Sequence, residues 1–86
     1  MTNQLFSRAG VRYEVALDVL GAIIAHHSEA IAAEREKATP DEAAIAAAQK
    51  AKDELRTIRE ELDPNADEAI ERVITQYGQQ ARDLYQ

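Results

Sequence analysis

Apolar residues recur with a helical spacing along the first third of the chain. The recurring positions, about 3.5 residues apart on average, are Phe6, Tyr13, Leu17, Leu20, Ile24, His27 and Ile31. Polar residues separate them, so the pattern predicts one long amphipathic helix over about residues 4–37. Its start is open between three signals: Asn3, a cap at Ser7, or a break at Gly10.

Two prolines divide the rest of the chain. The string Thr39, Pro40, Asp41, Glu42 has the pattern of a capping box with proline in the first helical position, so Thr39 is the expected N-cap. This predicts a second helix over about 40–62. Pro64 provides the same punctuation and predicts a third helix over about 64–84.

Each of the later helices also has an apolar face, which includes Ile45, Leu55, Ile58 and Leu62 in the second helix and Ile70, Val73, Ile74 and Tyr77 in the third. The turns between the helices are short. Short turns make successive helices fold back on one another, so the expected fold is all-α, an antiparallel three-helix bundle with a long first helix, in a single domain 1–86. Gly21, in the middle of the first helix, is expected to mark a close helix crossing. Gly78 either ends the third helix or lies within it.

Composition limits the size of the core. The chain has 86 residues, and alanine, with 17 copies, is its commonest apolar residue. A small chain that relies on alanine buries little apolar area. A homodimer, or a partner that completes the core, is therefore a reasonable expectation.

Charge and targeting signals restrict the class of partner. The net charge of −6 argues against a protein that binds nucleic acid or an anionic membrane, because both need clustered Lys and Arg. The chain has no cysteine, its first residues show no leader pattern, and its apolar stretches are interrupted well short of a membrane span. We expect a soluble, cytoplasmic protein with a basic or neutral protein partner.

Candidate chemistry is sparse. His26 and His27 are adjacent on a helix and point about 100° apart, so they cannot chelate one ion together. The serines and threonines lack a base at a recognisable spacing, and there is no glycine-rich phosphate loop. The sequence therefore predicts no metal, no cofactor and no enzymatic activity. His27 lies in the apolar stripe and is expected to be partly buried.

Two surfaces are candidates for partner binding. The densest acidic cluster includes Glu60, Glu61, Asp67 and Glu68. Some of these acids stabilise the start of the third helix by interacting with its dipole. The others form either a solvated face or a contact patch for a basic partner. The second candidate is a mixed strip of the first helix, formed by Arg12, Tyr13, Glu14 and Leu17. The alternative for Tyr13 and Leu17 is a place in the core.

The segment from Arg12 to Asp18, read as Arg-Tyr-Glu-Val-Ala-Leu-Asp, resembles the first helix of epsilon-type antitoxins. These are three-helix proteins that block the nucleotide site of zeta kinase toxins. The resemblance covers about ten residues. It implies inhibition by steric occlusion, with Tyr13, Glu14 and Leu17 near the contact and a toxin kinase as the partner.

The sequence thus favours a non-catalytic binding protein that neutralises a partner enzyme. The alternative is a structural or scaffold protein that dimerises through the stripe of the first helix.

Overall fold

A computed structural model describes residues 8–85, and within this range it contains three α-helices and no strand. They are α1 (Arg8–Arg35), α2 (Glu42–Glu61) and α3 (Asp67–Leu84). The all-α fold with a long first helix is confirmed. The predicted start of the first helix near residue 4 and the side chain of Phe6 lie outside the described residues.

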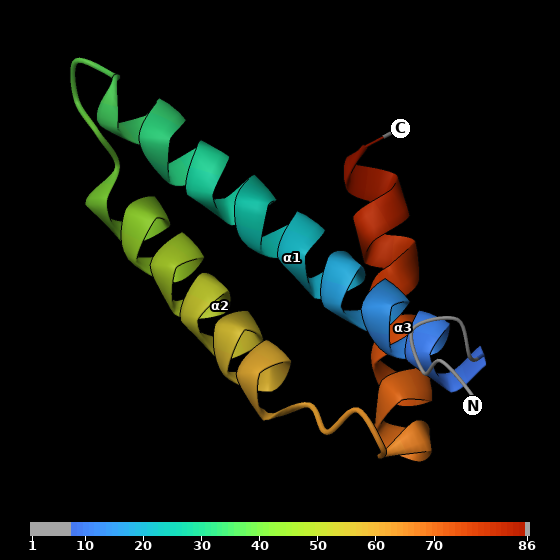
Figure 1. Ribbon diagram of the computed structural model, residues 1–86. Helices are drawn as coiled ribbons and strands as arrows, with labels where there is room; N and C mark the ends of the chain where they lie inside the picture. Colours follow the sequence, from blue (N-terminus) through green and yellow to red (C-terminus); the bar gives the residue numbers. More distant parts are fainter. Residues whose placement is uncertain (1–7, 86) are drawn as a thin grey trace.

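The long helix α1 is the spine of the molecule (Figure 1). Helix α2 runs back along it, and α3 then crosses the amino-terminal half of α1, so that both shorter helices pack on α1. The backbones of α2 and α3 do not come into contact with each other along their lengths. The bundle is consequently open on the side between α2 and α3.

The core forms where all three helices meet. Its buried residues are Ala16, Leu20 and Ile23 from α1, Leu55 from α2, Leu62 just after α2, and Ile70 and Val73 from α3. Ile31 is also buried, but it lies outside this cluster, in the part of the α1–α2 hairpin beyond α3. The predicted apolar stripe of α1 thus serves two packing regions rather than one.

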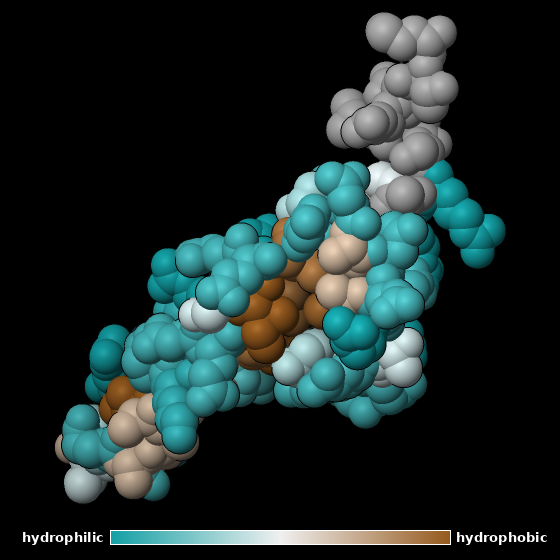
Figure 2. All heavy atoms as spheres, turned by 90° about the horizontal axis from the view of Figure 1, so that it is seen from below, coloured by the Kyte–Doolittle hydropathy of each residue, from teal (hydrophilic) through white to brown (hydrophobic). Residues whose placement is uncertain are grey.

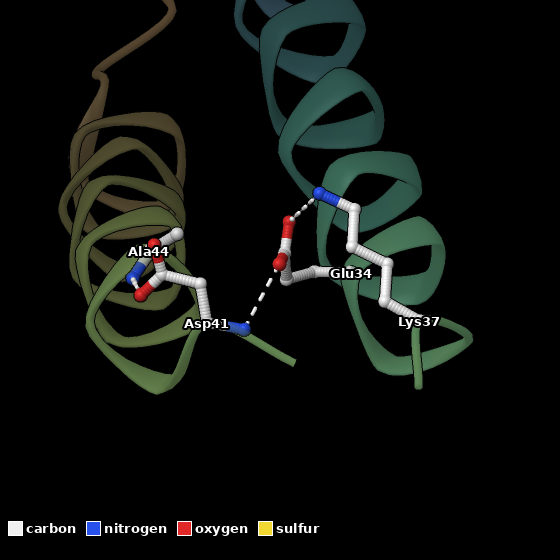
Figure 3. Close-up of polar contacts among 4 residues, drawn as sticks. All are labelled: Glu34, Lys37, Asp41 and Ala44. Carbon is white, nitrogen blue, oxygen red and sulfur yellow. Dashed lines mark hydrogen bonds and ion pairs between the residues drawn. The ribbon is translucent and has the colours of Figure 1, made fainter. Parts of the chain in front are cut away.

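The predicted N-cap of the second helix, Thr39, is wrong. Helix α2 begins at Glu42, and its N-cap is Asp41, whose Oδ1 accepts a hydrogen bond of 3.1 Å from the amide of Ala44. The backbone amide of Asp41 donates to Glu34 Oε1 at 2.9 Å, and Lys37 Nζ donates to the other oxygen of Glu34 (Figure 3). Because Glu34 takes up this amide, Asp41 is fixed outside the helix. Thr39 lies in the exposed turn and is not the cap.

Helix α3 also begins later than predicted, because residues 63–66 form a turn before it. Asp63 Oδ1 accepts from the amide of Asn65 at 2.8 Å, and the carbonyl of Asp63 accepts from the amide of Ala66 at 3.0 Å. This is the local bonding that Asp and Pro favour at the first two positions of a β-turn. Pro64 is therefore a turn residue, and α3 begins at Asp67.

The structure decides the roles of Gly21 and Gly78: the expectation for Gly21 is wrong, and for Gly78 the alternative of a place within the helix is confirmed. A Cβ added at Gly21 would meet Arg59 Nε at 3.9 Å, which is ordinary van der Waals contact. The expected close helix crossing at Gly21 is therefore wrong. Helix α3 continues through Gly78 to Leu84, and neither glycine has a positive φ.

Candidate interaction surface

A bidentate ion pair joins the start of α1 to the start of α3. Arg12 donates from Nε to Glu71 Oε2 at 2.8 Å and from Nη2 to Oε1 at 2.6 Å. These hydrogen bonds raise the pKa of Arg12 and lower the pKa of Glu71. The guanidinium of Arg12, which the sequence analysis counted among the partner-binding groups, is thus bound within the chain.

The other residues of the predicted strip divide between core and surface. Tyr13 and Leu17 are half-buried and pack against the core, while Glu14 is exposed. The carbonyl of Leu17 also accepts a 3.2 Å hydrogen bond from Arg59 Nε, which ties α1 to α2. Tyr13 and Leu17 therefore stabilise the bundle and expose only part of their surface.

The acidic cluster separates into engaged and free carboxylates. Asp63 bonds its own turn and Glu71 bonds Arg12, as described above. By contrast, the four acids of this cluster that were predicted to bind a partner have exposed side chains that form no hydrogen bond or ion pair with another described residue: Glu60, Glu61, Asp67 and Glu68. Asp67 and Glu68 lie in the first turn of α3, where the helix dipole favours negative charge.

The strip and the acidic cluster meet at one end of the molecule. A hollow of about 340 Å³ is lined by Arg8 and Arg12 of α1 and by Asp67, Ile70 and Glu71 of α3. Glu60 lies elsewhere, in a hollow between α1 and α2 that also includes Gly21 and Ile24. The structure therefore brings Arg12 and Asp67 together and leaves Glu60 apart from them.

A groove between α2 and α3 is the feature that sequence reasoning missed. It has a volume of about 290 Å³, and its apolar lining consists of Ile58, Leu62, Ala69, Val73 and Tyr77. Glu61, Arg72 and Gln76 complete it. Figure 2 looks onto the underside of the molecule and shows apolar surface enclosed by hydrophilic side chains in the middle of this face. In sequence, Ile58, Leu62, Val73 and Tyr77 have the helical periodicity of core residues. Periodicity does not reveal that α2 and α3 stay apart, so it could not indicate the groove.

The two imidazoles are neighbours on α1. His26 and His27 lie edge to face with 5.9 Å between ring centroids, and no group of three or more potential metal ligands occurs among residues 8–85. His27 is half-buried, and its pKa is lowered by burial and by the neighbouring His26.

Comparison with known proteins gives no relative. No family model, curated protein or solved structure matches the chain.

By length and composition alone, the segment Gly10–Arg35 could cross a membrane. The core helix of a soluble protein passes the same test, and in the structure this segment carries the buried residues on which α2 and α3 pack.

Proposed function

We propose that this protein is a non-catalytic protein-binding module that neutralises a partner enzyme by steric occlusion, as its resemblance to epsilon-type antitoxins implies. The observation that carries the proposal is the set of four exposed carboxylates without a partner among the described residues, Glu60, Glu61, Asp67 and Glu68. An exposed acidic surface raises the rate of encounter with a basic protein.

The geometry supports a division of roles between these acids and the strip of α1. Arg12 and Glu71 neutralise each other and hold α1 against α3, so they position the surface rather than contact the partner. The exposed parts of Tyr13 and Leu17 lie on the amino-terminal half of α1 and supply aromatic and apolar contact, and Glu14 beside them adds an exposed carboxylate. Occlusion needs only a rigid helical body placed over the partner's site, which is why no reactive group is required.

The proposal is tested by genetics and then by kinetics. An antitoxin is encoded beside the protein that it neutralises, so the adjacent gene expressed alone should arrest growth, and co-expression of this chain should restore it. With the purified pair, reversal of the four free acids to lysine should lower the association rate by about tenfold at low salt and leave dissociation nearly unchanged.

A matched control variant distinguishes the effect of these four positions on association from the effect of net charge. Reversal of four exposed acids elsewhere changes the net charge equally: Glu29 of α1, Glu36 in the turn after α1, and Asp53 and Glu54 of α2. It should reduce the association rate much less. Equal effects of the two quadruple variants, or no effect at low salt, would remove the acidic surface as the contact.

The alternative, a dimeric structural protein, has a separate observation in its favour. The apolar groove between α2 and α3 is not covered by any other described part of the chain.

A further inference from the structure

The groove between α2 and α3 interrupts the packing of the apolar faces of these two helices. Leu62 and Val73 form its floor and are buried, whereas Ile58, Ala69 and Tyr77 form its walls and are only half-buried. Helices α2 and α3 each pack on α1, and no described element packs on them from the other side. An apolar surface of this kind gains free energy when a further element excludes water from it.

The charges of the groove indicate which element that is. Glu61 lines the groove from α2 and Arg72 lines it from α3, and both side chains are exposed. Neither forms a hydrogen bond or an ion pair with another described residue. The lining thus has one unpaired charge of each sign on opposite helices, so it does not select for a strongly basic or a strongly acidic partner.

We propose that the groove is a self-association surface, and that its occupant is the same groove of a second copy of this chain. A two-fold axis along the groove places α2 of one copy over α3 of the other. Glu61 then faces Arg72 of the second copy, and the reciprocal pair forms at the same time, because a two-fold interface repeats every contact. The apolar walls of both copies meet between these two ion pairs, with Tyr77 as the largest side chain.

The proposal shares Glu61 with the acids of the function proposed above, but it is tested separately, because self-association is measured on the purified chain without a partner enzyme. The groove lies on a different face of the molecule from the junction of α1 and α3, and it does not involve the stripe of α1 that the sequence suggested for dimerisation. In that stripe Leu20 and Ile31 are buried within the chain, and Leu17, Ile24 and His27 are half-buried.

The area offered by one groove is small beside that of a stable interface, so the dimer should be weak. Interfaces at the low end of the size range give transient complexes. Sedimentation equilibrium of the full chain from about 5 to about 500 micromolar should therefore show a reversible monomer–dimer equilibrium within this range.

A charge-swap cycle tests the pairing. Glu61→Arg alone and Arg72→Glu alone each place like charges opposite one another twice in the dimer, and each should raise its dissociation constant about tenfold. The double variant Glu61→Arg with Arg72→Glu restores opposite charges and should return the constant to near that of the original chain. Both side chains are exposed and unpaired in the monomer, so thermal unfolding should change little.

Glu60→Arg is the matched control. Glu60 is adjacent to Glu61 and also exposed, but it lines the hollow on the α1 side of α2. This variant changes the net charge by the same amount and should leave the dissociation constant nearly unchanged.

Two results would overturn the proposal. A monomer across the whole concentration range would mean that the groove does not bind a second copy. A dimer in which the two single variants behave like Glu60→Arg, or in which the double variant remains weak, would place self-association on another surface.

Discussion

At the scale of single residues, Asp41 illustrates how one cap can displace another. Both Thr39 and Asp41 have side chains that cap helices well, and Pro40 lies between them. The choice is made by Glu34, 7 residues earlier in α1, because its carboxylate accepts the amide of Asp41. Local sequence rules could identify the break but not the residue that caps the helix.

The first prediction follows from this cap. Asp41→Ala removes the acceptor of the Ala44 amide and should lower the free energy of unfolding by about 1 kcal/mol in urea denaturation. Thr39→Ala is the matched control and should be nearly neutral, because Thr39 is exposed and forms no side-chain hydrogen bond with another described residue. A larger loss at Thr39 than at Asp41 would contradict the assignment of the cap.

At the scale of the helices, α1 contains one residue with a poor intrinsic propensity for helix. Gly21 lies in the middle of α1 with ordinary helical backbone, and an added methyl group would meet only Arg59 Nε at van der Waals distance. Glycine in such a position costs about 1 kcal/mol relative to alanine.

Gly21→Ala should accordingly stabilise the protein by up to about 1 kcal/mol, measured as a higher midpoint of urea unfolding with an unchanged slope. Ala25→Gly, one turn later at an exposed position, should lose a similar amount and serves as the reciprocal control. Destabilisation by Gly21→Ala would show that Arg59, whose side chain also bonds the carbonyl of Leu17, cannot adjust to the added methyl group.

The helices also differ in how they are held. Helix α3 is anchored to α1 near each end, by Glu71 to Arg12 and by the hydroxyl of Tyr85, which donates to the carbonyl of Ala22 at 3.0 Å. No such side-chain bond links α3 to α2 among the described residues. The Arg12–Glu71 pair joins residues 59 apart in the chain, and no spacing rule could have paired them.

At the scale of the whole molecule, acid should destabilise the fold in two separate steps. Burial lowers the pKa of His27 in the folded state below its usual value of 6.5, so the unfolded chain binds the proton first as the pH falls. Hydrogen bonds from Lys37 and from Arg12 lower the pKa of Glu34 and of Glu71 below 4.5. Their stabilisation is present above pH 4.5 and is lost as the pH falls through the folded-state values.

Two variants separate these steps. His27→Gln should remove the loss of stability that begins below about pH 6.5, so it gains stability relative to the original chain as the pH falls. Glu71→Gln should be less stable than the original chain near pH 7, and this difference should shrink below pH 4.5. Thermal unfolding between about pH 3 and pH 7.5 measures both. Parallel profiles for all three proteins would contradict the assignment of these groups.

The sequence by itself determined the number of helices, the two places where the chain turns, and the apolar positions of each helix. These features depend on interactions among residues a few positions apart, namely helix periodicity, proline and turn-forming side chains. Leu20, Leu55, Ile70 and Val73, all on the predicted apolar faces, are buried for that reason.

The tertiary structure alone decided which of those apolar residues remain accessible and which charges remain free. Ile58 and Tyr77 have the same periodicity as the core residues, yet they line a groove, because α2 and α3 each contact α1 and not each other. Within one acidic segment, Glu71 is paired and Glu68 is not, because Arg12 reaches only the former. Distances between residues far apart in the chain fix both outcomes, and a one-dimensional pattern does not contain them.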